Sequence, residues 1–190
     1  MKKKTIVTIV ILAIAAILVF SFIGTYNGMA QGREAVDTAR SDIDTVQQRR
    51  ADLIPNLVST VKALSNHELA ALDKVTAARA AMVGASNTAD KLAANEELTS
   101  AINALVVSVE AYPEISSAKA YTSLMDELAG TENRITYARK DYNDSVKSYN
   151  NKIITFPGSI IAGMFGFEKA EYYEASAGAE TTPSVEDLFE

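Results

Sequence analysis

The 190-residue sequence contains no cysteine and a single histidine, His67. Without cysteine there is no disulfide framework, no thiolate metal site and no cysteine nucleophile. One histidine excludes the His-Glu-x-x-His zinc helix and the paired Glu-x-x-His motifs of di-iron bundles. A hydrolase whose site is built from carboxylates alone is the least favoured function class, because the helical positions of the carboxylates are predicted to face solvent. We therefore expect no metal, no cofactor and no enzyme activity.

Proline and glycine are also scarce, with four and nine residues, and tryptophan is absent. The composition instead favours Ala, Leu, Glu, Lys and Val, which is typical of helices rather than of strands and turns. A chain of this length has room for one domain of ordinary size plus a short anchor or tail. The sequence predicts an all-α fold.

Basic residues are outnumbered, with 18 Lys and Arg against 24 Asp and Glu. Three of the lysines, Lys2, Lys3 and Lys4, precede a long apolar run, so the remainder carries 15 basic and 24 acidic residues, a net charge of -9. An acidic body is repelled by phosphate backbones, which argues against a nucleic-acid partner.

The apolar run is "TIVTIVILAIAAILVFSFIG", residues 5–24, and it holds no charge. About 20 apolar residues is the length that an α-helix needs to cross a bilayer. A signal peptide is the alternative, with Gly28-Met29-Ala30 as a weak cleavage site, but secretory cores are about 7–15 residues long. The excess of Lys near the N-terminus over Arg33 and Arg40 favours an inside N-terminus and a body outside the cytoplasm, and the reverse topology stays open.

The next part of the chain carries a seven-residue apolar repeat that is typical of a helical bundle or coiled coil. One polar residue, Arg50, occupies a seam position of this repeat. Pro55 falls between Leu53 and Leu57, so we expect a kink that keeps both leucines on the seam. The two apolar rows are Val36, Ile43, Leu57 and Leu64, and Ala39, Val46 and Leu53.

Turn and cap residues divide the bundle at "GASNTAD" (84–90) and "AYPEISS" (111–117), and Ser65 and Glu68 have the spacing of a capping box. Short connections favour antiparallel neighbours, which predicts an up-down four-helix bundle with helices near 32–64, 66–83, 89–112 and 117–155. Three long helices are the alternative. With four helices residue 155 ends near the membrane, and with three it ends far from it.

Six blocks of the sequence occur in the order found in a known family and together cover about residues 20–174. They are "IGTYNGM", "RRADLIPNLVSTVK…HE", "VTAAR", "EAYPEI", "ELAGTENRITYARKDYNDSVKSYNNKI" and "FPGSIIAGMFGFEKAEYYE". On these blocks the chain resembles the LemA family of bacterial membrane proteins. The resemblance implies a membrane-anchored helical bundle in the bacterial cell membrane. It implies no enzyme activity and no catalytic residues.

The blocks "RRADLIPN" and "ELAGTENR" fall at the same height if the first and last helices are antiparallel, because both rise ~1.5 Å per residue. Arg49 or Arg50 could then pair with Glu127 or Glu132, and Asp52 with Arg134. Such pairs either fix helix register or form a mid-bundle polar patch that binds a partner or ligand. The candidate interaction residues are Arg49, Arg50, Asp52, Pro55, Asn56, Glu127, Glu132, Arg134 and Tyr137.

Two further features follow near the C-terminus. Tyr142-Asn143 and Tyr149-Asn150 are one heptad apart, and ring packing is their expected role. The segment "FPGSIIAGMFGFEKAEYY" is too short and Gly-broken to span a bilayer, and either closes the bundle or contacts the membrane. Its candidate membrane-proximal residues are Ile160, Ile161, Met164, Phe165 and Phe167.

The predicted organisation is a basic N-terminus (1–4), a transmembrane helix (5–24), a helical bundle (25–155), an apolar C-terminal segment (156–175) and an acidic disordered tail (176–190). We expect a single-pass protein of the bacterial inner membrane. Its partners would be the lipid bilayer and other membrane or envelope proteins, for which it acts as scaffold or adaptor. A sensor or ligand-binding bundle, with a pocket lined by Arg50, Glu132 and Tyr137, is the second hypothesis, and a homo-oligomer stays open.

Overall fold

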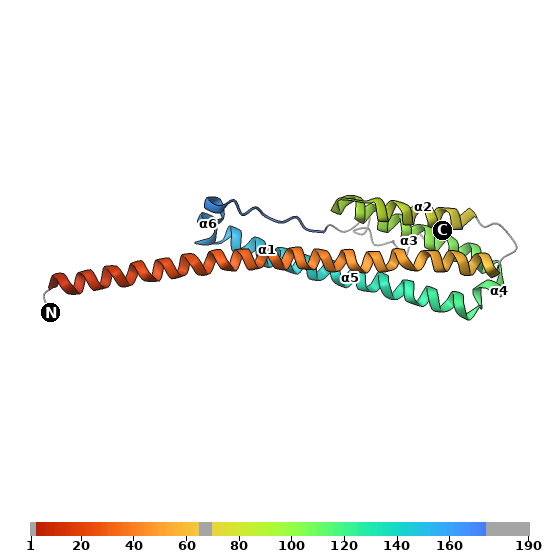
Figure 1. Cartoon of the computed structure of the whole chain (residues 1–190), viewed down its shortest axis with the longest axis horizontal. Coiled ribbons are helices and arrows are strands. Elements are labelled where there is room, and N and C mark those ends of the chain that lie inside the picture. Colours follow the sequence, from red (N-terminus) through yellow and green to blue (C-terminus); the bar gives the residue numbers. More distant parts are fainter. Residues whose placement is uncertain (1–2, 65–69, 174–190) are drawn as a thin grey trace, which may run out of the picture. The chain divides into compact units, whose positions relative to one another are not determined.

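The structure, a computed structural model, describes residues 3–64 and 70–173. The described residues contain no strand, so the all-α prediction is confirmed. His67, the Ser65–Glu68 capping box and the tail 176–190 lie outside the described residues. The helices are α1 (Lys3–Leu64), α2 (Ala70–Gly84), α3 (Thr88–Glu110), α4 (Pro113–Ser116), α5 (Lys119–Ile154) and α6 (Gly158–Phe165) (Figure 1).

The chain divides into two compact units. Unit 1 contains Met1–Ala39 and Arg139–Glu190, and unit 2 contains Arg40–Ala138. The long helices α1 and α5 each contribute to both units, whereas α2, α3 and α4 belong to unit 2 and α6 belongs to unit 1. Each unit has contacts of its own.

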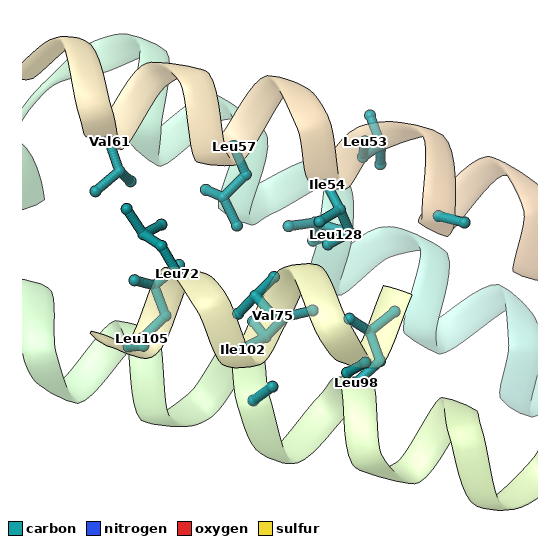
Figure 2. Close-up of a cluster of buried hydrophobic side chains, with 14 of the residues drawn as sticks. Leu53, Ile54, Leu57, Val61, Leu72, Val75, Leu98, Ile102, Leu105 and Leu128 are labelled. Atoms are coloured by element: carbon teal, nitrogen blue, oxygen red, sulfur yellow. The ribbon is translucent and has the colours of Figure 1, made fainter. Parts of the chain in front are cut away.

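Unit 2 is built around an aliphatic core. Side chains of α1, α2, α3 and α5 point toward one another, with Ile54 and Leu128 among them (Figure 2). One face of α3 is buried along its length, because Leu98, Ile102, Leu105 and Val109 recur every three or four residues. Other members of this core are Ala51, Leu53, Leu57, Val61, Leu72, Val75 and Met82.

The helices of unit 2 alternate in direction. The turn before α3 is capped by Asn87, whose Oδ1 accepts a hydrogen bond from the backbone N–H of Asp90 at 2.8 Å. α3 runs parallel to α1, since Lys91 of α3 pairs with Asp44 and Asn95, one turn later, contacts Arg50. α2 therefore returns antiparallel between them, as expected for up-down connections.

Helix α1 continues through Pro55 without a break. Leu53 and Leu57 are both buried, whereas Pro55 is exposed on the outer side. The proline thus costs one backbone hydrogen bond and leaves the apolar seam intact, as the repeat predicted.

Unit 1 brings the end of α5 back beside α1. Lys152 Nζ donates a hydrogen bond to the Gly28 carbonyl at 3.0 Å, and a Cβ at Gly32 would lie 3.1 Å from the Tyr149 ring. Gly32 therefore allows the two helices to approach closely. Gly28 lies four residues beyond the apolar run 5–24, so the structure agrees with the predicted four-helix arrangement, in which α5 ends near that run, rather than with three long helices. The apolar run itself is wholly unburied and long enough to be a candidate membrane span.

An extended strap, residues 167–173, runs along α5 in unit 1. Asn150 donates to the Ala170 carbonyl and accepts from the Ala170 N–H, both at 2.9 Å. One heptad earlier, Asn143 makes the same pair of bonds with Tyr173, at 2.9 and 2.8 Å. Tyr142 and Tyr149 are buried, as expected for packed rings, but the sequence did not predict that the asparagines hold the strap.

Candidate functional site

Arg50 is the buried charge of unit 2. Its position on the apolar seam predicted a guanidinium inside the bundle or at its edge, and the side chain is 3% exposed. A buried guanidinium is costly unless its donors find acceptors, so its partners decide what the position does.

The Arg50 side chain reaches two other helices. Its Nη1 donates to Asn95 Oδ1 at 2.8 Å and to Thr99 Oγ1 at 3.1 Å, both on α3. It also forms an ion pair with Glu132 on α5. Thr99 in turn donates to the Asn95 carbonyl at 2.9 Å, which orients its hydroxyl as an acceptor for Arg50. We call Arg50, Asn95, Thr99 and Glu132 the arginine node.

A second arginine supplies the hydrogen-bond donor that Pro55 removes from α1. Pro55 has no N–H, so the carbonyl of Ala51, four residues earlier, lacks its normal helical donor. Arg79 of α2 donates its Nε to that carbonyl at 2.8 Å. Ala51 is 1% exposed, so water could not easily replace this donor. Pro55 thus leaves a carbonyl acceptor without its helical donor inside the bundle, and Arg79 of α2 donates to it.

The remaining predicted ion pairs divide into one that is present and one that is not. Arg49 Nη2 lies 2.8 Å from Glu127 Oε1, with both side chains about half exposed. Asp52 accepts a hydrogen bond from Gln48 Nε2 at 2.9 Å, rather than the expected one from Arg134. Arg134 is exposed.

Tyr137 does not enclose the arginine node, which corrects the pocket expected from Arg50, Glu132 and Tyr137. The side chain of Tyr137 is 69% exposed. It follows the fully buried Ile135 by two residues, and two residues turn a helix by about 200°. Glu132, three residues before Ile135, shares its buried face. The height estimate brought the two blocks together, but it set Arg50 level with Tyr137, whereas the structure pairs Arg50 with Glu132, five residues earlier on α5. It also ignored the direction in which each side chain points.

The outer face of α1 forms an open groove of about 700 Å³ in unit 2. Three of the candidate interaction residues, Arg49, Asp52 and Asn56, line it, so they present polar groups to the solvent rather than to the core. The residues of this α1 groove are Ser41, Asp44, Thr45, Gln48, Arg49, Asp52, Leu53 and Asn56.

A smaller pocket of about 180 Å³ lies between α1, the end of α2 and the start of α3. Gln47 lines it and is 4% exposed, and its Nε2 has no hydrogen-bond acceptor among the described residues. The Lys91–Asp44 ion pair, 2.7 Å long, forms a charged wall, and Met82 and Val83 add apolar surface. We call this the Gln47 pocket.

The acid–base chemistry of unit 2 is limited. Burial raises the pKa of Tyr121, and the charge of Glu110 raises it further, so this hydroxyl stays protonated at neutral pH. No group of three or more His, Asp or Glu side chains comes together as a metal site within residues 3–64 and 70–173. The arrangement suits binding and structural roles.

The candidate membrane-proximal residues of unit 1 lie on different sides of α6. Ile161 is buried against the helices, whereas Ile160, Met164 and Phe165 are more than half exposed and Phe167 is half-buried. The Phe165 ring packs on Tyr26 with centroids 4.9 Å apart. The segment therefore both closes the unit and leaves an apolar outer face.

The sequence did not lead us to predict roles for Asn95, Arg79 and Gln47. Asn95 and Arg79 could have been recognised, because each is the polar member of an otherwise apolar row. Asn95 precedes Leu98 by three residues and Ile102 by seven, and Arg79 follows Leu72 by seven. A polar residue in an apolar row, such as Arg50, needs a polar partner where the helices meet, and the same holds for Asn95 and Arg79.

A comparison with protein-family models matches residues 39–186 to the family described as "LemA family". The match covers most of the chain, including all of the residues of the arginine node.

Curated relatives extend the likeness over the N-terminal region. Magnetosome protein MamQ 2 of Paramagnetospirillum magneticum is 27% identical over 95% of this chain and 77% of its own length. Magnetosome protein MamQ of Magnetospirillum gryphiswaldense is 28% identical over 94% and 77%. Protein LemA of Metamycoplasma hominis is 26% identical over 84% and 74%.

Proposed function

Since the chain belongs to the LemA family, we propose that it is a non-enzymatic, membrane-anchored envelope protein whose helical bundle is a scaffold or adaptor for other membrane or envelope proteins. The apolar N-terminal part of α1 supports the anchor, because it has the length of a span and no burial. Two of the relatives are named as magnetosome proteins, and none of the three names denotes an enzyme.

The α1 groove is the observation that carries the scaffold proposal. It presents Arg49 and Asp52, charges of opposite sign, and the amide of Asn56 on one exposed helix face. The arginine node on the opposite side of the same helix segment fixes α1 against α3 and α5. A polar surface on a fastened helix can bind a partner without first being ordered, which lowers the entropic cost of binding.

The location that we propose is the bacterial inner membrane, with the bundle outside the cytoplasm. The lysines at positions 2–4 support this orientation. Protease added to intact spheroplasts should degrade the bundle, and protection of the bundle until the membrane is lysed would establish the reverse orientation.

Site-specific photocrosslinking in intact membranes tests the scaffold role. A benzophenone amino acid at Asn56 or Thr45, in the α1 groove, should give discrete crosslinked bands whose partner is identified by mass spectrometry. The same group at Thr122, exposed on α5 in the same unit, is the matched control and should give none.

A charge reversal makes the test specific to this surface. Asp52→Lys should weaken the crosslink at Thr45 several-fold while the helical content is unchanged, because Asp52 is exposed and its hydrogen bond is to Gln48 of the same helix. Crosslinks that are equally strong from Thr122, or no reproducible partner from the groove, would count against the scaffold.

Ligand sensing is the second candidate function, and the Gln47 pocket favours it. A buried amide N–H without an acceptor is expensive, and a ligand oxygen or a water would satisfy it. Acetate and acetamide are minimal probes that offer such an oxygen. Either should raise the melting temperature of the wild-type protein and not that of Gln47→Leu, and no shift with either probe would remove this candidate.

A further inference from the structure

The C-terminal part of unit 1 contains an uncharged stretch, residues 155–167 with the sequence "TFPGSIIAGMFGF". It includes the turn after α5, the whole of α6 and the first residue of the strap. The charged residues nearest to it are Lys152 and Glu168. Thirteen residues without a charge are too few to cross a bilayer, and they are unusual on a water-exposed surface.

Helix α6 has two distinct faces. Gly158, Ile161 and Ala162 are buried, and a Cβ at Gly158 would lie 2.7 Å from Met29 Cε, so this face packs tightly on the unit. On the other face Ile160 is 56% exposed and Met164, four residues later, is 66% exposed. Closure of the unit therefore explains one face of α6 and leaves the other unexplained.

The exposed apolar surface extends beyond the helix. Ile154, at the end of α5, is 52% exposed, and Phe156, in the turn before α6, is 81% exposed. Together with Ile160 and Met164 these residues form what we call the α6 outer face. Large apolar side chains that gather in this way mark a contact with another apolar phase.

Aromatic contacts place α6 at the end of the apolar run of α1 (Figure 1). The Phe165 ring lies 5.8 Å from that of Phe22 and 4.9 Å from that of Tyr26. Phe167 also packs on Tyr26, with centroids 5.5 Å apart. Residues 5–24 rise about 30 Å as a helix, the thickness of the hydrocarbon core, so Phe22 and Tyr26 fall at its border. Aromatic side chains are enriched at that level.

We propose that α6 lies in the membrane interface as a second attachment point, with the α6 outer face immersed at the boundary of the acyl chains. The proposal rests on the membrane anchor of the proposed function. Lipid is the occupant that the structure favours, because the apolar surface is continuous, through Phe165, with the border of the span itself. An uncharged amphipathic helix at this level buries its apolar face by lying in the interface plane.

The second attachment limits the orientation of unit 1. A single helix leaves the attached part free to tilt and rotate, whereas a span and an adjacent interfacial helix define a plane. Lys152, whose Nζ donates a hydrogen bond to the Gly28 carbonyl, is then a charged residue that lies just outside the apolar border.

Single-tryptophan fluorescence tests the proposal, because the natural sequence has no tryptophan. Ile160→Trp and Met164→Trp place the probe on the α6 outer face, where the exposed side chains leave room for the ring. Val107→Trp, on an exposed position of α3 in unit 2, is the matched control. Each full-length variant is reconstituted in vesicles of phosphatidylglycerol and phosphatidylcholine, with and without bromine on the acyl chains of the phosphatidylcholine.

Brominated lipid should quench Ile160→Trp and Met164→Trp several-fold more strongly than Val107→Trp, and their emission should be blue-shifted. Quenching no stronger than that of Val107→Trp in both variants would overturn the proposal. A blue shift without quenching would also overturn it, and would assign the α6 outer face to a second copy of the chain.

A fourth variant separates this proposal from the anchor on which it rests. Leu12→Trp lies in the middle of the apolar run and is exposed in the isolated chain. If Leu12→Trp is quenched and the α6 variants are not, the interfacial helix is wrong and the anchor stands. If Leu12→Trp is not quenched either, the anchor itself is wrong and both proposals fail.

Discussion

The two units of this chain use different chemistry to hold their parts together. In unit 2 helices α1 to α5 share a mainly aliphatic core, and polar contacts beside it join the side chains of Arg50, Asn95 and Glu132. In unit 1 the asparagines of α5 bind the backbone of the strap, and aromatic rings join α6 to α1. Apart from the bond of Arg79 to the Ala51 carbonyl, the polar contacts between helices of unit 2 join two side chains, whereas those that hold the strap of unit 1 join side chains of α5 to its backbone.

The difference follows from what each unit packs. Helices satisfy their own N–H and C=O groups, so they need only side-chain contacts to fix their register. An extended strap has no internal hydrogen bonds, and its backbone groups need partners from elsewhere. Asparagine suits that task because its amide both donates and accepts, and the seven-residue spacing of Asn143 and Asn150, ~10 Å along α5, matches three extended residues of the strap.

The largest effect should come from removing the charge of the arginine node. Arg50→Ala leaves Asn95, which is 1% exposed, and the carboxylate of Glu132 without their guanidinium partner. Breaking a buried pair from one side costs about 3–5 kcal/mol, and we expect about 3 because Glu132 is partly exposed. Equilibrium urea unfolding of the full-length protein in detergent, followed by circular dichroism, measures the change.

Arg49→Ala is the control for this comparison. Its ion pair with Glu127 is about half exposed on both sides, so its loss should cost less than about 1 kcal/mol. Equal losses for the two neighbouring arginines would mean that burial of Arg50 adds nothing, and that unit 2 is held by its aliphatic core alone.

The arginine node was partly predictable from sequence. The heptad repeat placed Arg50 on the apolar seam, inside the bundle or at its edge. Helix rise brought the blocks that contain Arg50 and Glu132 to the same height, although it set Tyr137 rather than Glu132 level with Arg50. Tyr137 was wrong because the estimate was five residues off along α5 and because height along a helix says nothing about side-chain direction. Asp52 bonds Gln48 of its own helix rather than Arg134. Asn95 and Arg79 needed the contacts between helices, which a single sequence does not give.

The strap of unit 1 was less predictable. Residues 167–173 have neither a helical nor a strand period, so no pattern indicated their path. Tyr142-Asn143 and Tyr149-Asn150 were recognised as one face of α5, and their rings are packed as expected. Side-chain hydrogen bonds to the backbone of an irregular segment leave no periodic signal, which is why the role of the asparagines emerged only from the structure.

A double-mutant cycle tests the contact between α1 and α2 that Pro55 creates. With Pro55 present, Arg79→Ala should cost about 1.5–3 kcal/mol, because it removes a charged donor from the buried Ala51 carbonyl. With Pro55→Ala the N–H of residue 55 can bond the same carbonyl, so Arg79→Ala should cost less than about 1 kcal/mol. Urea unfolding of the four proteins gives the coupling energy. Equal costs in both backgrounds would show that Arg79 acts independently of the proline.

The smallest effect should be local to the strap of unit 1. Asn150→Ala removes the donor and the acceptor that hold Ala170, and each such bond contributes about 1 kcal/mol, so the Ala170 amide should exchange with deuterium about tenfold faster or more. Asn151→Ala changes the same residue type one position away, where the side chain is exposed, and should leave that exchange unchanged. Because the strap contacts only unit 1 in these bonds, exchange in α2 and α3 should be the same in both variants. Faster exchange throughout α2 and α3 in Asn150→Ala would instead mean that the strap stabilises the whole chain. The two units would then not be held together by separate sets of contacts.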